Sequence, residues 1–468
     1  MSMIELKKIE VPKEEPCLLP IGLTDDTIKQ RYSKLLCKMK MAAYDALVIY
    51  ADLEHGSNFE YLTGFLPRFE EALLIVYECG KAYMVLGNEN LNKASKSRVP
   101  AEAVHMPHFS LPNQPMPVEE TVEEILRKTG IQDKNRIGLV GWKNFTSKME
   151  DNSKLTELPY YIVQAIRSIC PRAEITNAAY LFIGEDGIRT VNNANEFAHY
   201  EFGASLAGNG MLNAVQKLQP GMREMDVAHC LEAYGQKNSV VTIAAAGERF
   251  VKANMYPTQN LIKVGDRLSL TVGYKGGLQS CCGYVVKDRE QLPSAEKDYL
   301  EKVAKPYFYA VKTWLEKIRI GCLGSEIYES INSVLPKDKY GWLLNPGHLC
   351  ADEEWLSSPI YQGSNEIIKS GMLLQIDIIV SVPGYGGVNC ESGIFLADGQ
   401  LRKDIREQYP EVWKRVEHRR RFVIETLGID ISDEVLPTSN STALCRPYLL
   451  DKDAVLVYVK QGCSCQRH

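Results

Sequence analysis

The spacing of apolar residues changes near the middle of the chain, and this change limits the folds available to it. Between residues 24 and 179, apolar runs such as YDALVIYA and EALLIVYEC alternate with amphipathic stretches such as VEETVEEILRKTG. Strands and helices that alternate in this way predict a layered α/β domain. From Asn192 onward, long amphipathic helices and paired strand patterns follow instead, which predicts an α+β domain.

The chain has 468 residues, which is too long for one ordinary hydrophobic core. The glycines and charges of IGEDGIRT at 183–190 mark a boundary, so we predict domains at 1–185 and 186–468. In the second domain we expect helices at 193–218, 222–237, 295–318 and 324–335, and strands within 239–247, 267–286 and 371–398.

Composition and charge argue against several classes of protein. The formal net charge is −5, and phosphate or anionic-membrane surfaces need clustered Lys and Arg, so we expect neither a nucleic-acid nor a membrane partner. The basic cluster within 414–421 is interpreted as a solvated helix face. No apolar run approaches the roughly 18 residues that span a bilayer. The N-terminus lacks a signal-peptide pattern, and the thirteen cysteines are scattered, so we expect reduced thiols and a cytoplasmic location.

Several common catalytic motifs are missing from the sequence. Neither GxGxxG before a helix nor GxxxxGK[ST] occurs, and HExxH and GxSxG are absent as well. The usual nucleotide-binding, zincin and α/β-hydrolase interpretations are therefore excluded.

An unusual feature is the stretch TVGYKGGLQSCCGYVV at 271–286, in which two strand patterns meet at a Gly-rich bend. It carries Cys281 and Cys282 side by side. Because successive side chains of a strand point to opposite faces, one thiol faces each side.

Four segments carry a resemblance to a known family. They are the helix start IRTVNNANEFAHY, the segment AAAGERFVKANMYPTQNLIKVGDRLSLTVG, the turn NPGHL, and GMLLQIDIIVSVPGYGGVNCESG. In order and spacing they resemble the pita-bread peptidase family (M24), which includes proline dipeptidase, aminopeptidase P, methionine aminopeptidase and creatinase. The first domain, with FEYLTGF, resembles the companion domain of the prolidase and creatinase branch. The resemblance implies an α+β pita-bread domain after a smaller α/β domain, and a homodimer.

The same resemblance implies where metal ligands should stand. Active members hold two metals with Asp, Asp, His, Glu and Glu, because hard oxygen ligands support two close cations. The corresponding positions in this sequence are Thr271, Cys282, His348, Asp377 and Glu391. Two of these five residues match the family pattern, one is a shorter acid, and two are not acids. The resemblance thus implies a degenerate metal site in which the usual two-metal centre is not expected.

The family's substrate-facing residues are also altered. Its first His corresponds to Asn254 and its second to Trp355, and neither side chain exchanges protons near neutral pH. Arg249 and Lys252 lie in the segment that the family places over its pocket. They could pair with a substrate carboxylate, neutralise former ligands, or face water.

These residues leave three hypotheses open. In the first, Cys282, His348, Asp377 and Glu391 hold one zinc or another divalent metal, and the chain hydrolyses an amide or other C–N bond of a small molecule or peptide. In this hypothesis His348, Glu391 and Cys282 are the catalytic residues, with Asn254, Trp355 and Arg249 binding substrate. Cys282 as a small packed residue is the competing interpretation.

In the second hypothesis a thiol is a nucleophile paired with His348. Its candidates are Cys281, Cys282, Cys350 and Cys390. In the third hypothesis the chain is a catalytically inactive pita-bread protein that binds a small ligand or a protein partner. The tail CSCQRH at 463–468 is interpreted as a frayed terminus rather than a metal site.

Overall fold

A computed structural model describes residues 4–16, 18–116, 119–248 and 254–460. The chain divides into two compact units. The smaller unit comprises Leu23–Thr190, and the larger unit comprises the segment up to Gly22 together with the chain from Val191 onward. The sequence placed the boundary at 185/186. The structure differs in that the described residues before Leu23 pack with the larger unit, which their sequence position alone does not reveal.

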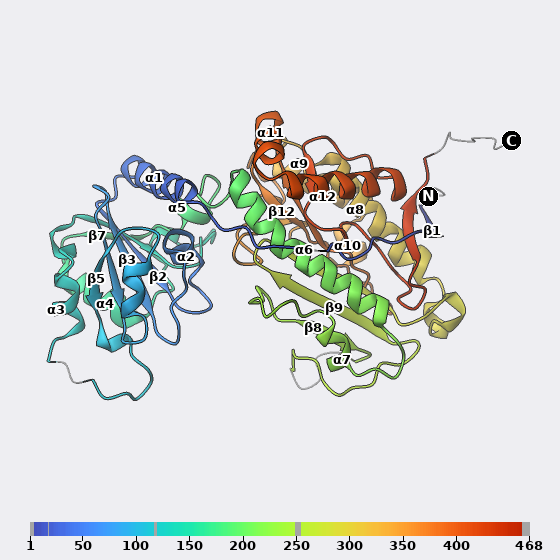
Figure 1. Ribbon diagram of the computed structural model, residues 1–468, viewed down its shortest axis with the longest axis horizontal. Coiled ribbons are helices and arrows are strands. Elements are labelled where there is room, and N and C mark those ends of the chain that lie inside the picture. The colour runs from blue at the N-terminus through green and yellow to red at the C-terminus, as the bar shows by residue number, and fades with distance from the viewer. Residues whose placement is uncertain (1–3, 17, 117–118, 249–253, 461–468) are drawn as a thin grey trace. The chain divides into compact units, whose positions relative to one another are not determined.

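The smaller unit is built on a six-stranded sheet of order β5-β4-β3-β2-β6-β7. The strands are β2 (Ala46–Ala51), β3 (Ala72–Tyr77), β4 (Ala82–Leu86), β5 (Glu102–His105), β6 (Arg136–Val140) and β7 (Glu174–Asn177). The helices are α1 (Asp25–Met41), α2 (Ser57–Thr63), α3 (Val122–Arg127), α4 (Tyr160–Ile169) and α5 (Tyr180–Ile183) (Figure 1). β2 is parallel to β6 and antiparallel to β3, so the sheet is mixed. All residues of β2 are buried, as its unbroken apolar run predicts for a central strand.

The larger unit contains a three-stranded sheet of order β10-β9-β8 and a four-stranded sheet of order β11-β12-β13-β14, with all pairs antiparallel. The first sheet comprises β8 (Ile243–Ala246), β9 (Arg267–Tyr274) and β10 (Gly277–Tyr284). The second comprises β11 (His348–Leu349), β12 (Leu373–Ile376), β13 (Ser392–Leu396) and β14 (Val435–Pro437).

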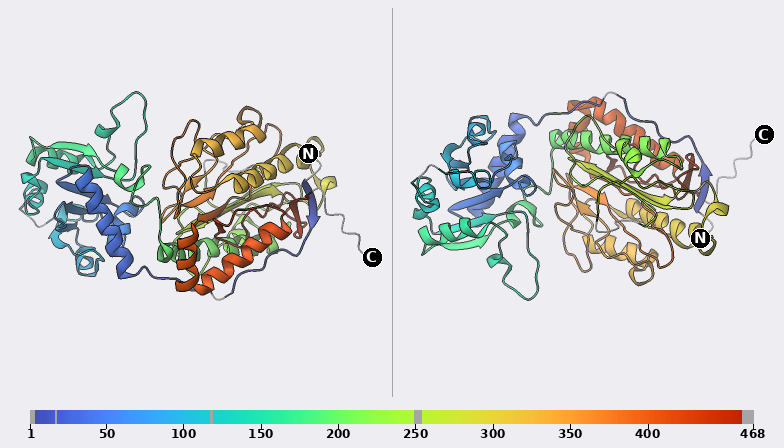
Figure 2. Two further views of the ribbon diagram at one scale, coloured as in Figure 1. Left: turned by 90° about the horizontal axis from the view of Figure 1, so that it is seen from above. Right: turned by 90° about the horizontal axis from the view of Figure 1, so that it is seen from below.

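Seven α-helices are assigned among the described residues of this unit. They are α6 (Ala194–Lys217), α7 (Glu224–His229), α8 (Lys305–Lys317), α9 (Gly324–Val334), α10 (Lys337–Tyr340), α11 (Gly399–Gln408) and α12 (Pro410–Arg421). Figure 2 shows the strands lying between α8 and α9 on one side and α6 and α12 on the other. This arrangement confirms the predicted α+β class. The candidate site lies where the two sheets approach each other.

Two predicted helices differ from those observed. The helix expected at 222–237 ends at His229, because the chain then makes turns before β8. The helix expected at 295–318 begins as a π-helical stretch at Leu300–Ala304, and the α-helix α8 starts only at Lys305. Pro306 has no N–H to donate to the preceding turn, which fits the change from π-helical to α-helical bonding at this point.

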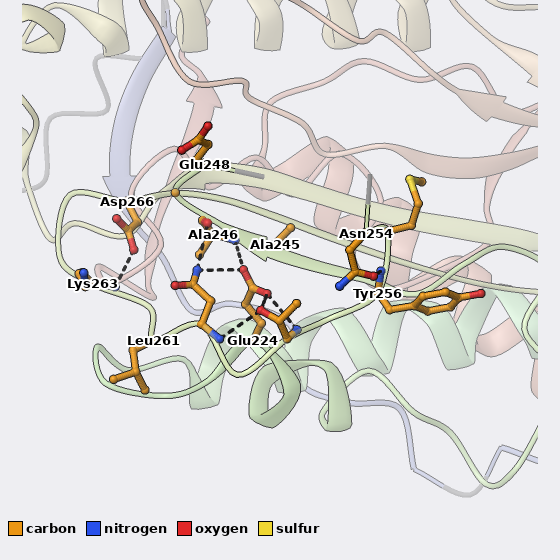
Figure 3. A pocket seen from close by; sticks show the side chains of 13 residues that line it. Glu224, Ala245, Ala246, Glu248, Asn254, Tyr256, Leu261, Lys263 and Asp266 are labelled. Atoms are coloured by element: carbon orange, nitrogen blue, oxygen red, sulfur yellow. Dashed lines mark hydrogen bonds between the residues drawn. The ribbon is translucent and has the colours of Figure 1, made fainter. Parts of the chain in front are cut away.

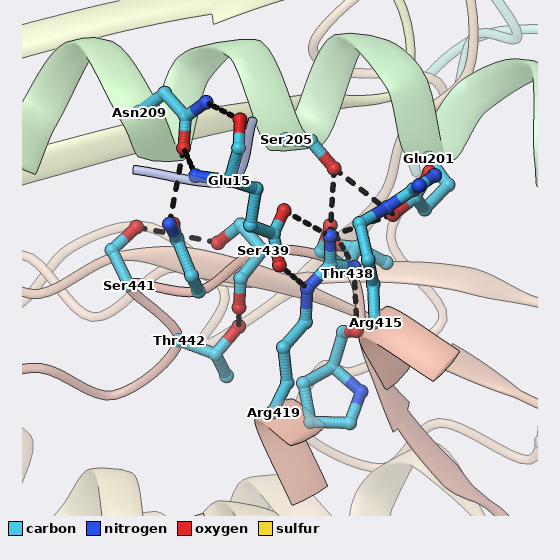
Figure 4. Close-up of polar contacts among 12 residues, drawn as sticks. Glu15, Glu201, Ser205, Asn209, Arg415, Arg419, Thr438, Ser439, Ser441 and Thr442 are labelled. Carbon is cyan, nitrogen blue, oxygen red and sulfur yellow. Dashed lines mark hydrogen bonds and ion pairs between the residues drawn. The ribbon is translucent and has the colours of Figure 1, made fainter. Parts of the chain in front are cut away.

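The first described residues of the chain form hydrogen bonds and ion pairs with distant residues of the larger unit. β1 (Ile4–Lys8) pairs antiparallel with β15 (Ala454–Tyr458). Further along, the carboxylate of Glu15 accepts hydrogen bonds from Arg419 Nε at 2.7 Å and Nη2 at 2.5 Å (Figure 4).

Arg419 also corrects the interpretation of the basic cluster. Its Nη2 lies 2.6 Å from Glu201 Oε1, and Arg415 Nη2 lies 2.6 Å from Glu201 Oε2. Arg419 is 1% exposed, so this part of the cluster is not a solvated face but the centre of a buried ion-pair network. Its partner Glu201 lies on α6, far away in sequence.

No helix in the described part of the chain is long and apolar enough to cross a membrane.

Candidate functional site

The β9–β10 hairpin presents one polar face to a cavity. Thr271 is opposite Ser280, and their hydroxyl oxygens lie 2.8 Å apart. Cys282 is opposite Ser269, and Cys282 Sγ lies 3.0 Å from Ser269 Oγ. These four residues line the cavity, whereas Cys281 packs in the hydrophobic core with residues of α6. The prediction that the two thiols face opposite sides is confirmed.

The second sheet adds Asp377 and Glu391 to the lining of this cavity and places His348 in the same group. His348 begins β11, Asp377 directly follows β12, and Glu391 directly precedes β13. The backbone N–H of Ser280 donates to the carbonyl of Glu391 at 3.3 Å, which joins the two sheets at this point. The residues lie within 43 positions of each other in sequence, but it is the antiparallel pairing that brings them together.

His348, Asp377 and Glu391 form a compact group. Each offers one ligand atom, and these atoms all lie within 4.8 Å of one another. His348 is 0% exposed, and each carboxylate residue is 4% exposed. His348 Nε2, Asp377 Oδ1 and Glu391 Oε1 are buried without a hydrogen-bond partner. Three buried polar atoms without partners in one place indicate an absent ligand, because such atoms are normally satisfied.

The imidazole of His348 is fixed in one tautomer. Its Nδ1 lies 3.1 Å from the backbone carbonyl of Leu349. A carbonyl can only accept, so Nδ1 carries the proton and Nε2 presents a lone pair. Burial lowers the pKa of His348 to about 4, which keeps the ring neutral at pH 7. A neutral ring held by a backbone carbonyl is the form in which His binds metals.

Burial has the opposite effect on the two carboxyl groups. It raises the pKa of Asp377 to about 7, with a further contribution from the negative charge of Glu354. The pKa of Glu391 is raised well above its usual range by burial, and then by Asp377 and Glu354, although Ser280 and Gln375 lower it by hydrogen bonding. Burial therefore favours the protonated form of both carboxyl groups, and a bound cation would favour their ionised form.

The cavity around the group has a volume of about 680 Å³. Leu344, Trp355 and Ile379 line it and are exposed, so part of its wall is apolar and open to a ligand. Glu354 also lines it and makes no hydrogen bond or ion pair with any residue that the structure describes. Burial raises the pKa of Glu354.

Trp355 covers His348. The two rings are stacked with centroids 4.2 Å apart and an interplanar angle of 21°. The indole therefore shields one face of the imidazole and stands at the wall of the cavity, as expected for a residue that contacts a ligand.

Asn254 lies in a different pocket. That pocket has a volume of about 420 Å³ and also contains Glu224 (Figure 3). Asn254 is exposed, and its Oδ1 accepts from the backbone N–H of Tyr256 at 3.1 Å. The structure does not bring Asn254 together with the His348 group, although Gly247 and Glu248 line both pockets.

Glu224 organises the loop of this second pocket. Its carboxylate accepts from the backbone N–H of Ala246 at 2.9 Å and of Thr258 at 3.0 Å, and from Asn260 Nδ2 at 3.1 Å. Burial raises the pKa of Glu224, but these hydrogen bonds outweigh it and lower the pKa overall. A carboxylate satisfied in this way has a structural role.

The predicted thiols are spread over several environments. Cys350 is buried and donates to the carbonyl of Gly276 at 3.7 Å, and Cys390 is buried next to Glu391. Burial raises the pKa of Cys281 to about 12 and raises that of Cys350 as well. Thiols with raised pKa values form little thiolate at neutral pH, which argues against them as nucleophiles. Cys282 lines the cavity but is not part of the group formed by His348, Asp377 and Glu391.

Arg249, Lys252 and the tail at 463–468 lie outside the described residues. Glu354 and Ser280 are site residues that the sequence did not single out. The signal for Glu354 was its position beside Trp355 in DEEW, and that for Ser280 was the strand alternation that places it on the same face as Cys282.

Comparison with known proteins agrees with this fold. Residues 199–398 match the family model of metallopeptidase family M24, and residues 31–184 match that of the creatinase/prolidase N-terminal domain. The chain therefore belongs to the M24 family, in its prolidase and creatinase branch.

Individual relatives are distant. An uncharacterised peptidase, YqhT of Bacillus subtilis, is 24% identical over 241 residues, which are 49% of this chain and 67% of that protein. Among solved structures, prolidase from Thermococcus sibiricus has a TM-score of 0.63 at 19% identity and covers 81% of this chain and 96% of its own. An Xaa-Pro dipeptidase from Bacillus anthracis has a TM-score of 0.60 at 18% identity and covers 80% and 96%. At these identities the structural likeness supports the fold.

Proposed function

We propose that this chain is a hydrolase whose cavity holds one divalent metal on His348, Asp377 and Glu391 and cleaves an amide or other C–N bond of a small molecule or peptide. One observation carries the proposal. His348 Nε2, Asp377 Oδ1 and Glu391 Oε1 are buried without partners, and the three residues offer ligand atoms that lie within 4.8 Å of one another. Among the described residues no cationic side chain pairs with either carboxylate, so a bound cation is the group that satisfies all three.

The donor set suits one cation better than two. Metal–ligand distances of about 2.0–2.2 Å place donors around a single ion at roughly the spacing of this group. The two positions where the family has Asp ligands hold Thr271 and Cys282, and each is paired with a serine on the facing strand. One imidazole and two carboxylates are compatible with zinc, manganese, iron or cobalt. A preference for zinc is expected only if the thiolate of Cys282 is also a ligand.

A metal in this place supplies Lewis-acid chemistry, because it polarises a carbonyl and makes water more acidic. The residues of the chain contribute the rest. Leu349 holds the His348 tautomer, and Trp355, Leu344 and Ile379 bind an apolar part of the substrate and exclude water. Glu354, a carboxyl group of the cavity lining outside the metal group, would hold or transfer a proton.

A second candidate is ligand binding without turnover. It is favoured by the stack of Trp355 on His348, because an indole stands where the family resemblance implies a proton-transferring His. Asn254, at the other such position, lines the separate pocket. In this candidate the same metal, or an organic cation, occupies the group and no bond is cleaved.

Metal analysis combined with hydrolysis assays tests the proposal. The purified chain should bind one divalent metal, and Asp377→Asn should abolish both binding and the release of amine from small amides and dipeptides. Glu224→Gln is the matched control, because it alters a satisfied carboxylate of the neighbouring pocket and should leave metal binding intact. Metal binding without hydrolysis would favour the second candidate, and two metals per chain would contradict the single-metal site. The cytoplasmic location and the homodimer remain proposals, the latter to be checked by light scattering.

A further inference from the structure

A separate pocket lies beneath the N-terminal strap, which we define as residues 9–14. It has a volume of about 640 Å³. Its lining consists of the strap, of Leu212 and Gln216 from α6, and of Arg446 and Asp453. All of these residues belong to the larger unit, and none of them belongs to the His348 group.

The strap is fixed at both ends. On one side β1 pairs with β15, and the backbone N–H of Ile9 donates to the carbonyl of Asp453 at 3.0 Å. On the other side Asn440 Nδ2 donates to the carbonyl of Lys13 at 2.8 Å. The N–H of Glu15 donates to Asn209 Oδ1 at 2.9 Å (Figure 4). The strap is therefore held at both ends by hydrogen bonds to other parts of the larger unit.

Arg446 is an unsatisfied cation in the lining of this pocket. It is 3% exposed, and its Nε is buried without a hydrogen-bond partner. Within the part of the chain that the structure describes, no hydrogen bond or ion pair joins its guanidinium to another residue. Asp453 acts on it only at longer range, and burial lowers the pKa of Arg446 more than Cys281 and Asp453 raise it.

Other buried arginines of the chain keep at least one partner, although Arg31 Nη2 and Arg189 Nε are also buried without one. Arg31 donates to the carbonyl of Tyr61 at 2.9 Å, and Arg189 donates to Asn58 Oδ1 at 2.9 Å. Arg419 has two carboxylates, as described above. A buried guanidinium is costly unless it is paired, so an unpaired one that lines a cavity indicates a missing acceptor.

We infer that this pocket binds a small oxyanion, with Arg446 as its main partner. A phosphate, sulfate or carboxylate group matches the guanidinium fork and satisfies its donors. Lys13 adds a positive charge at the exposed rim, and the exposed Glu10, Glu14 and Asp453 oppose large polyanions. The inferred ligand is therefore one small anionic group, free or on a metabolite. This site is independent of the proposed function of the metal group.

Thermal unfolding and calorimetric titration test the inference. Inorganic phosphate, sulfate and acetate are titrated separately into the full chain at constant ionic strength, with chloride as the reference salt. At least one oxyanion should raise the Tm above that in chloride. A response to phosphate or sulfate indicates a tetrahedral ligand, and a response to acetate alone indicates a carboxylate.

Arg446→Met should weaken oxyanion binding at least about tenfold, which corresponds to the loss of a charge-assisted hydrogen bond. Without anion this variant should be no less stable than the wild type, because it removes an unpaired buried charge. Arg421→Met removes the same charge from an exposed position and should keep the full anion response.

Gln216→Glu provides a second variant that does not depend on removing Arg446. A carboxylate in the lining should raise the Tm without anion and reduce the response to phosphate. The inference is overturned if no oxyanion shifts the Tm of the wild type beyond chloride, or if Arg446→Met and Arg421→Met respond equally.

Discussion

Two groups of buried charge in the larger unit follow opposite rules. The Arg419 group balances its charges, since Glu201 faces Arg419 and Arg415, and Glu15 completes the coordination of Arg419 (Figure 4). The His348 group does not, since Asp377 and Glu391 share their site with a neutral imidazole.

The pKa values express this difference. Burial raises the pKa of Glu201, but Arg419 and Arg415 outweigh it and lower the pKa overall. Burial and neighbouring negative charge raise the pKa values of Asp377 and Glu391. The Arg419 group shows that this fold can pair buried charges with one another, and the lack of such pairing in the His348 group supports the proposal that a cation binds there.

Breaking the balanced group should have the largest effect. Arg419→Met leaves Glu201 and Glu15 buried beside a methionine, so we expect the free energy of unfolding to fall by about 3–5 kcal/mol. Urea denaturation measures the change. Arg421→Met is the control, for which about 0.5 kcal/mol or less is expected because Arg421 is exposed. Equal effects of the two substitutions would show that the network does not hold the fold together.

Removing one charge from the unbalanced group should have the opposite sign. In chelator-treated protein, Asp377→Asn should raise the free energy of unfolding by about 1–2 kcal/mol, because it removes a buried unpaired carboxylate without changing its size. With metal at about 100 times its dissociation constant, the wild type should gain about 2.7 kcal/mol, and the variant should gain nothing. A chelator-treated variant less stable than the wild type would show that Asp377 serves packing or hydrogen bonding instead.

The two groups should also give opposite responses to pH. The folded-state pKa of Glu201 is lowered, so its contribution to stability is present above the unfolded pKa and is lost as pH falls through the folded pKa. The folded-state pKa of Asp377 is raised to about 7, so the metal-free folded state binds an extra proton and loses stability as pH rises from about 4 to 7.

Unfolding curves measured in chelator across that pH range separate these contributions. Asp377→Asn should flatten the loss of stability toward pH 7, and Glu201→Gln should flatten the loss at acid pH. A wild type and an Asp377→Asn variant with parallel pH profiles would be inconsistent with an unpaired carboxyl group in the cavity.

The smallest effect is expected at the aromatic wall. Trp355→Phe keeps a ring over His348, so metal affinity should change by less than about tenfold, whereas Trp355→Ala should lower it by about 10–100-fold because the imidazole loses its support. Isothermal titration with zinc and manganese measures both variants. If Trp355→Ala bound metal as tightly as the wild type, the stack would be relevant only to the substrate.

The sequence predicted the fold and the positions of the group better than it predicted the balance of charges. Strand alternation correctly separated Cys281 from Cys282, and the family resemblance implied that His348, Asp377 and Glu391 belong to one site. The first feature depends on a local period that the sequence records directly, and the second depends on the resemblance of several motifs to a known family.

The pairing of distant charges was not predictable in the same way. Arg419 contacts Glu201 across 218 positions and Glu15 across 404 positions, so no local pattern records these contacts. The cluster containing Arg419 was accordingly interpreted as a solvated face. The sequence did not single out Arg446 for the same reason, because the pocket that it lines is formed with the distant residues 9–14.

Metal content, measured by mass spectrometry on the purified chain after dialysis against zinc, manganese and cobalt, tests the central claim most directly. We predict one divalent metal per chain in the wild type, one in Glu224→Gln, and none in Asp377→Asn. Two metals per wild-type chain, or a metal that persists undiminished in Asp377→Asn, would contradict a single site on His348, Asp377 and Glu391.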